Sequence, residues 1–91
     1  MSRSKWKLVV APSAERSLAR LPEKAAAAIV EFLVGPLTDE PLLVGHALRG
    51  DLEGLFAARR GPYRVVYAVD RATRRIEVLR IDHRADVYRP R

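Results

Sequence analysis

The spacing of apolar residues predicts a strand and two helices in the first half of the chain. Residues 6–11, W-K-L-V-V-A, have the composition of a first strand, and Pro12 then fits the first turn of a helix because the missing N–H is not needed there. Apolar positions then recur at helical spacing as far as Pro22, and again beyond it as far as Gly35-Pro36, which we expect to end the second helix. The two helices therefore form a hairpin with a tight connection.

The second half of the chain has the pattern of three strands joined by short turns. Gly61-Pro62 and the polar run 71–74 are turn sequences, and Gly54 predicts a break or bulge in the first of the three strands. The predicted strands are Leu52–Arg59, Tyr63–Asp70 and Arg75–Asp82, with a short edge piece at Ala47–Arg49. Strands connected this tightly form an antiparallel meander. The order predicts a small two-layer α+β domain (βααβββ) over residues 1–91, with the helical hairpin on one face of a sheet of about four strands.

Arg64 stands out in the central strand of this meander. Side chains alternate faces along a strand, so Tyr63, Val65 and Tyr67 share one face and Arg64 lies on the other. A charge in the middle of an apolar strand is costly unless it is paired or reaches water. Arg64 therefore extends to solvent, pairs with a carboxylate or lines a site. The same alternation divides the last strand into two apolar pairs, one on each face: Ile76 with Val78, and Leu79 with Ile81.

The net charge of +6 comes entirely from residues 56–91. Residues 1–55 carry seven basic and seven acidic side chains, whereas residues 56–91 carry ten basic side chains, all arginine, against four acidic ones. Arginine forms bidentate, charge-assisted hydrogen bonds with phosphate and carboxylate. The distribution favours a polyanionic partner, either nucleic acid or an acidic protein.

Several classes of protein are disfavoured by composition. The chain has no cysteine, so it has no disulfide framework and no thiolate metal site. The longest apolar run, Ala25–Val30, is far too short to cross a bilayer. His46 and His83 lie far apart in sequence and neither has a partner at metal-ligand spacing. We expect a cytoplasmic protein with no membrane association and no cofactor.

The candidate chemistry gathers at the end of the chain, where His83, Arg84 and Tyr88 follow the last strand. Together with Arg64 they suit metal-free cleavage of RNA by its own 2′-OH. Arginines stabilise the charge that develops on phosphorus, a histidine carries a proton, and a tyrosine orients the nucleotide. Two structural alternatives remain open: His83 as a capping residue at the strand end, and Tyr88 as a lid on the core.

Four sequence blocks carry a resemblance to the RelE/ParE superfamily of bacterial toxins, and to its RelE branch in particular. They are A-x-R-S-L-x-R-L-P at 14–22, L-R-G-D-L-E-G-L at 48–55, R-x-G-x-Y-R-V-V-Y at 59–67 and H-R-x-D-V-Y at 83–88. The resemblance covers nearly the whole chain. It implies a type II toxin that cleaves mRNA in the ribosomal A site, held inactive in a hetero-oligomeric complex by a RelB-like antitoxin that wraps around it.

The resemblance also implies roles for individual residues. Arg64 matches the arginine that stabilises the phosphate, Arg84 the arginine near the leaving group, and Tyr88 the tyrosine that packs on or orients the nucleotide. His83 falls where members of the family carry histidine or lysine. The remaining basic positions, which we expect to bind substrate phosphate, are Arg59 and Arg60.

One departure from the RelE pattern leaves the general base unassigned. Some members carry two basic residues on the strand before the central one, at positions that Leu55 and Ala57 occupy here. Either His83 takes the role of base, or Arg59 and Arg60 supply charge only. Two other functions therefore remain open: a ParE-like toxin that binds DNA gyrase without cleaving anything, and a nucleic-acid-binding module whose arginines contact phosphates.

Overall fold

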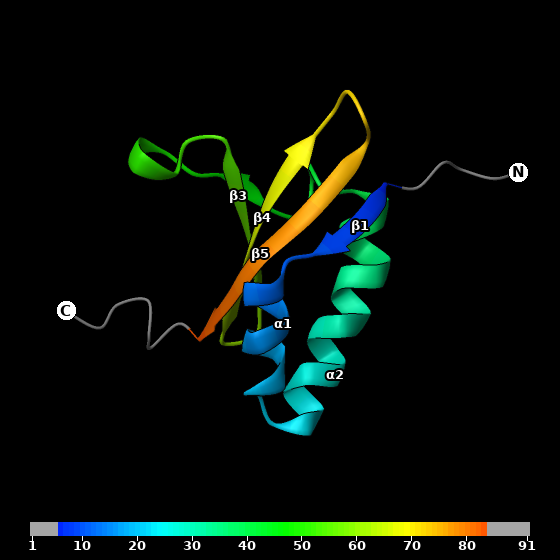
Figure 1. Cartoon of the computed structure of the whole chain (residues 1–91), viewed down its shortest axis with the longest axis vertical. Coiled ribbons are helices and arrows are strands. Elements are labelled where there is room, and N and C mark those ends of the chain that lie inside the picture. The colour runs from blue at the N-terminus through cyan, green and yellow to red at the C-terminus, as the bar shows by residue number, and fades with distance from the viewer. Residues whose placement is uncertain (1–5, 84–91) are drawn as a thin grey trace, which may run out of the picture.

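The computed structural model describes residues 6–83, in which two helices pack on one face of a mixed β-sheet (Figure 1). The strands of this part of the chain lie side by side in the order β1-β5-β4-β3-β2. Their bounds are β1 Lys7–Val10, β2 His46–Ala47, β3 Leu55–Arg60, β4 Tyr63–Asp70 and β5 Arg75–His83. The strands β3, β4 and β5 form the antiparallel meander, and the predicted α+β class and element order are confirmed.

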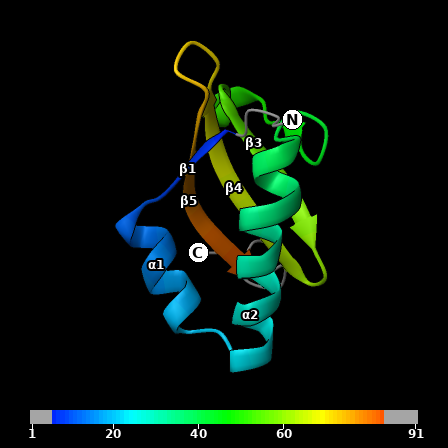
Figure 2. The same cartoon turned by 90° about the vertical axis from the view of Figure 1, so that its right-hand side faces the viewer.

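Strand β1 pairs in parallel with β5 at one edge of the sheet, and the helical hairpin carries the chain from β1 towards β2 at the opposite edge. The helix α1 spans Pro12–Ala19 with its proline in the first turn, as expected, and α2 spans Glu23–Phe32. In Figure 2 both helices lie in front of the sheet. The core lies between the two layers and draws on buried apolar side chains of helices and strands alike: Ala14, Ile29, Phe32, Leu33, Val65, Tyr67, Ile76 and Val78.

The second helix does not end at Gly35-Pro36, which corrects the prediction from sequence. Helical winding continues through a π-helical turn, η1 (Leu33–Leu37), that contains Pro36. A wider turn accommodates a proline ring, which has no N–H to donate to an ordinary helical ladder. The Thr38 hydroxyl shares its one proton between the carbonyls of Val34 and Gly35 in a bifurcated hydrogen bond.

The first strand of the meander starts later than predicted. A short 3₁₀ turn, η2 (Gly50–Leu52), stands where the strand was expected to begin, and β3 starts at Leu55. Gly54 has a φ of +97°, a conformation that residues with a side chain rarely adopt, so the chain turns there before the strand begins. The edge piece is the two-residue β2 rather than 47–49.

A β-bulge in β5 corrects the predicted division of its apolar residues. Tyr67 pairs with Val78 but Val66 pairs with Arg80, which leaves Leu79 as the extra residue. One inserted residue reverses the alternation beyond it, so Ile81 joins Ile76 and Val78 in the core. The Leu79 carbonyl accepts a hydrogen bond from the Ser13 hydroxyl at the start of α1.

The loop before β2 is anchored to the core by Tyr67, whose side chain is fully buried. The Tyr67 hydroxyl donates a 2.6 Å hydrogen bond to the Pro41 carbonyl. Gly45 passes so close that an added Cβ would lie 2.3 Å from the same hydroxyl and 2.7 Å from the Ala57 carbonyl oxygen. The loop therefore has little freedom where it enters β2.

The burial of Tyr67 predicts a loss of stability at high pH. Burial raises the pKa of Tyr67 from 10.0 to about 12, so the unfolded chain releases the phenolic proton first. The stabilising contribution of the protonated Tyr67 side chain is present below pH 10 and is lost as the pH rises towards 12. Over this range the free energy of unfolding falls by up to about 1.4 kcal/mol per pH unit. Urea unfolding at several pH values should show a steeper decline for the wild type than for Tyr67→Phe, and parallel curves would contradict this.

Candidate functional site

Four charged side chains gather on the face of the sheet that the helices leave uncovered, here called the open face. They come from β3, β4 and β5, near the end of the sheet at which β3 turns into β4: Arg59, Arg64, Arg80 and Asp82. Residues directly opposite each other in an antiparallel pair project to the same side of the sheet. Arg59 lies opposite Arg64, and Arg64 lies opposite Asp82. The row therefore crosses three strands.

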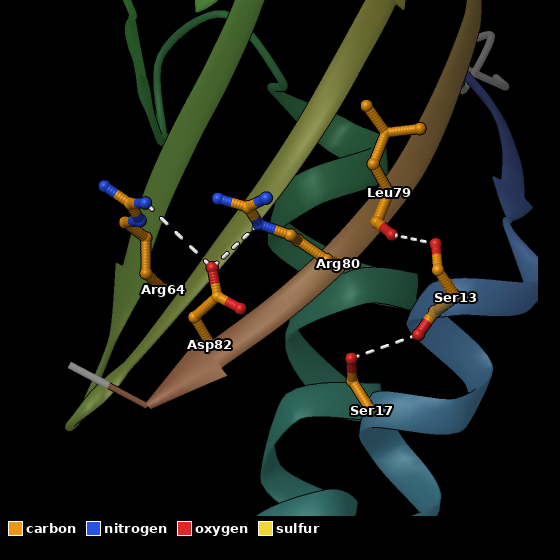
Figure 3. A network of polar contacts seen from close by, with 6 residues as sticks. All are labelled: Ser13, Ser17, Arg64, Leu79, Arg80 and Asp82. Atoms are coloured by element: carbon orange, nitrogen blue, oxygen red, sulfur yellow. Dashed lines mark hydrogen bonds and ion pairs between the residues drawn. The ribbon is translucent and has the colours of Figure 1, made fainter. Parts of the chain in front are cut away.

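The Asp82 carboxylate lies between two guanidinium groups (Figure 3). Arg80 Nε donates a 2.9 Å hydrogen bond to Asp82 Oδ2, and Arg64 Nη2 lies 3.9 Å from the same oxygen. The side chains of Arg64 and Asp82 are 30% and 24% exposed, and an ion pair of that exposure contributes at most about 1 kcal/mol to stability. The ion pairs of the cluster therefore contribute little to the stability of the fold, and the cluster is better suited to binding an anion.

Arg64 retains hydrogen-bonding capacity in this arrangement. Its Nε is buried and has no hydrogen-bond partner within residues 6–83, and the contact of its Nη2 with Asp82 is longer than a hydrogen bond. A buried donor without an acceptor is unfavourable. A phosphate oxygen at this face could accept a hydrogen bond from the exposed part of the Arg64 guanidinium.

Two other predicted site residues lie on the helical face of the sheet instead. The Arg60 guanidinium lies 5.5 Å from the centroid of the Phe32 ring on α2. His83 is opposite Tyr63, and their rings meet edge to face with centroids 5.3 Å apart. Both contacts lie on the side of the sheet that faces the core, so the sheet separates Arg60 and His83 from Arg64.

A hollow of about 490 Å³ lies on that helical side, between the first half of α2 and the β3–β4 turn. Its walls are mainly apolar, with two cationic side chains among them: Lys24, Ala25, Ala28, Ile29, Arg60, Gly61, Pro62 and Tyr63. Because it opens on the opposite side of the sheet, the hollow is separate from the arginine cluster around Asp82.

Comparison with known proteins identifies the family. The family model described as the ParE toxin of the type II toxin-antitoxin system, parDE, matches residues 8–88. The chain belongs to the RelE/ParE superfamily of toxins. It is 51% identical over 84 residues to Toxin RelE of Mycobacterium tuberculosis, a match that covers 92% of this chain and 87% of that protein. The resemblance inferred from the four sequence blocks is thereby confirmed.

Solved structures of the superfamily share the fold. The toxin-antitoxin complex RelBE2 from M. tuberculosis contains a chain that superposes with a TM-score of 0.86 at 43% identity, covering 89% of this chain and 100% of that one. The archaeal RelE–RelB complex from Pyrococcus horikoshii superposes with a TM-score of 0.69 at 27% identity, covering 87% and 94%. In both cases a RelE-type toxin was solved together with an antitoxin.

The structure separates the predicted site residues of this toxin into three groups. Arg59 and Arg64 are neighbours on the open face, while Arg60 and His83 lie on the helical face. Arg84 and Tyr88 lie outside the described residues. Analysis of the sequence missed Arg80 and Asp82 as members of the site. Arg80 and Asp82 flank Ile81 on β5, so simple alternation puts their side chains on one face and that of Ile81 on the other. Only the pairing of β5 with β4 shows that this face also carries Arg64.

Two further findings concern other kinds of site. Within residues 6–83, no three histidine, cysteine, aspartate or glutamate side chains lie together as a metal-binding group. Over the same residues, no helix has both the length and the apolar character needed to cross a membrane.

Proposed function

We propose that this toxin is a ribosome-dependent mRNA endoribonuclease that cuts in the A site and so inhibits translation. The observation that carries the proposal is the arginine cluster on the open face, where Arg64 and Arg80 pair with the Asp82 carboxylate and Arg59 lies opposite Arg64. Three cations against one anion leave this patch with a net positive charge. Its geometry suits a phosphate group with bonds to more than one guanidinium.

In the proposed reaction the substrate supplies its own nucleophile. The 2′-OH loses its proton, its oxygen attacks the adjacent phosphorus, and the bond from phosphorus to the 5′-oxygen breaks. The products are a 2′,3′-cyclic phosphate and a 5′-OH that has gained a proton. Arg64, whose guanidinium is partly exposed on the open face, stabilises the extra negative charge on phosphorus as the transition state forms.

The other predicted residues take part as the superfamily resemblance implies. Arg84 acts near the leaving group and Tyr88 orients the nucleotide. His83 transfers a proton, and Arg59 and Arg60 bind flanking phosphates. Because Arg60 and His83 lie on the helical face, an RNA chain that contacts them as well as Arg64 has to cross the end of the sheet at the β3–β4 turn.

The proposed partner of the toxin in the resting cell is a RelB-like antitoxin. Solved relatives from M. tuberculosis and P. horikoshii are RelB–RelE type complexes. An antitoxin for this chain, which carries a net charge of +6, would place an acidic, amphipathic segment over the open face and cover Arg64. The resulting toxin–antitoxin complex is a hetero-oligomer in the cytoplasm.

A cell-free translation reaction with purified protein and a defined mRNA tests the proposal. Primer extension should reveal new 5′ ends at A-site codons, and the same RNA without ribosomes should be cut poorly, because the ribosome supplies much of the substrate geometry. Vigorous cleavage of naked RNA would contradict the dependence on ribosomes. Intact mRNA with unaffected translation would refute the nuclease. A supercoiling assay would then test the gyrase-binding function suggested by the ParE family match.

Asp82→Asn is expected to separate binding from cleavage. Loss of the carboxylate raises the positive charge of the open face, so binding to programmed ribosomes should strengthen and become more sensitive to salt. Arg64 and Arg80 lose the negative charge that they share, and the rate of cleavage of the bound mRNA should fall about tenfold because the guanidinium groups are held less firmly. Single-turnover rates and filter binding at two salt concentrations measure both effects. Weaker binding together with unchanged cleavage would contradict this.

A further inference from the structure

His46 lies on the open face, in the row of residues next to the arginine cluster. It forms β2 with Ala47 and lies directly opposite Ala57 of β3, which lies opposite Val66 of β4. Residues paired in this way project to one side of the sheet. Val66 follows two residues after Arg64 on the same strand and therefore shares its face. His46 is thus on the same side of the sheet as Arg64, and its side chain is exposed.

The register of β2 and β3 makes His46 a neighbour of Arg59 on the open face. Arg59 is two residues beyond Ala57, which makes it a diagonal neighbour of His46 with Cα atoms about 7–8 Å apart. Arg59 in turn lies opposite Arg64. The residue of β3 directly opposite His46 is Ala57, which has only a methyl group and is 1% exposed. An RNA chain that binds Arg64 through the reacting phosphate and Arg59 through a flanking phosphate would therefore run towards His46.

The chemistry on this face requires a group that accepts a proton. Arginine remains charged in proteins and cannot act as a base. The Asp82 carboxylate is occupied by Arg80 and Arg64, and His83 is on the other side of the sheet. Among residues 6–83, His46 is the one histidine on the open face. Imidazole is the side chain best suited to accept and release protons near neutral pH.

We propose that His46 is the general base of the RNA cleavage reaction, an inference that rests on the proposed nuclease function. The imidazole accepts the proton of the 2′-OH while the 2′-oxygen forms its bond to phosphorus. The electron pair of the breaking bond passes to the 5′-oxygen, which takes a proton from water. The proton on His46 is then released to solvent, and the enzyme is ready for another turnover.

The backbone of the loop that precedes His46 is constrained by contacts with the core, and a catalytic side chain needs such a fixed backbone. Gly45 lies against the Tyr67 hydroxyl and the Ala57 carbonyl, and Tyr67 fixes Pro41 a few residues upstream. These contacts leave little room for movement of the backbone immediately before His46. An exposed imidazole on a constrained backbone is accessible to substrate and comes from a defined position opposite Ala57.

The test compares His46→Ala and His46→Gln with the wild type on programmed ribosomes, using single-turnover cleavage and, separately, ribosome binding. The matched control is Ala47→Gln, which alters the same two-residue strand on its other face. Both His46 variants should cleave at least about a hundredfold more slowly, with unchanged binding and melting temperature, because general base catalysis contributes about 10² to 10⁴ in rate. Added imidazole should restore part of the activity of His46→Ala, and the control should retain full activity.

The possible results distinguish the role of His46 as general base from the nuclease function on which it rests. Cleavage by His46→Ala at the wild-type rate would overturn the role of His46 while leaving the nuclease intact. A loss that appears only in ribosome binding would also overturn it, because His46 would then be a binding residue. A wild-type protein that cuts no mRNA on ribosomes would refute the nuclease function and the general base with it.

Discussion

Arg64→Ala is expected to reduce mRNA cleavage on the ribosome by about 10² to 10³ while leaving the fold intact. Arg64 lies at the centre of the open-face row, between Arg59 and Asp82, and supplies the donors nearest to the phosphate in the proposed reaction. Removal of one preorganised donor to a developing negative charge typically costs this much in rate. Arg64→Lys should recover only a small part, because an ammonium group cannot reproduce the planar fork of donors.

The matched control for this variant is Arg71→Ala. Arg71 is an exposed arginine in the β4–β5 turn, at the far end of the same strand, so its removal changes the net charge equally. If net charge alone were responsible, Arg64→Ala and Arg71→Ala would lose the same amount of cleavage activity. Primer extension and single-turnover rates should show loss for Arg64→Ala only, with similar melting temperatures throughout. Equal and modest losses in both would favour a module that binds nucleic acid through general charge, in which losses add smoothly.

The order of secondary structure was predictable because the turns and helix starts are strongly marked in the sequence. Pro12, Pro22 and Gly61 stand at boundaries that the structure reproduces. The predictions from sequence were wrong where tertiary packing overrides the local sequence signals. The π-helical turn carries the chain past Pro36, and the bulge at Leu79 reverses the facing of β5. Neither feature has a reliable signature in one sequence, since each depends on contacts made between separate elements.

The candidate site was predictable only in part, for a related reason. Arg64 could be identified because a charge within an apolar strand requires an explanation. The same reasoning does not show which partners it meets, since these are set by the register of β3 and β5 against β4. His46 comes from a loop with no periodic pattern, and its place on the open face follows from a two-residue strand that the sequence does not mark. Sheet register, more than residue type, assembles this site.

Gly45→Ala is expected to destabilise the protein by about 3 kcal/mol, enough to lower the melting temperature by more than about 10 °C. An added Cβ would lie 2.3 Å from the Tyr67 hydroxyl and 2.7 Å from the Ala57 carbonyl oxygen, both closer than a real contact allows. Overpacking of this kind costs about 1–3 kcal/mol. If the Tyr67 hydroxyl moves away, its buried hydrogen bond to Pro41 is broken at a further cost of about 1–3 kcal/mol.

The Tyr67→Phe variant shows which contact is responsible. It removes the hydroxyl, and with it the nearest obstacle to a new methyl group at position 45, at the cost of the hydrogen bond to Pro41. Gly45→Ala should therefore cost less in the Tyr67→Phe background than in the wild type, and a double-mutant cycle from urea unfolding would measure a coupling of about 1 kcal/mol or more. Strict additivity would mean that the clash with the Ala57 carbonyl dominates. Because His46 follows Gly45 directly, the single variant should also lose cleavage activity at temperatures where it remains folded.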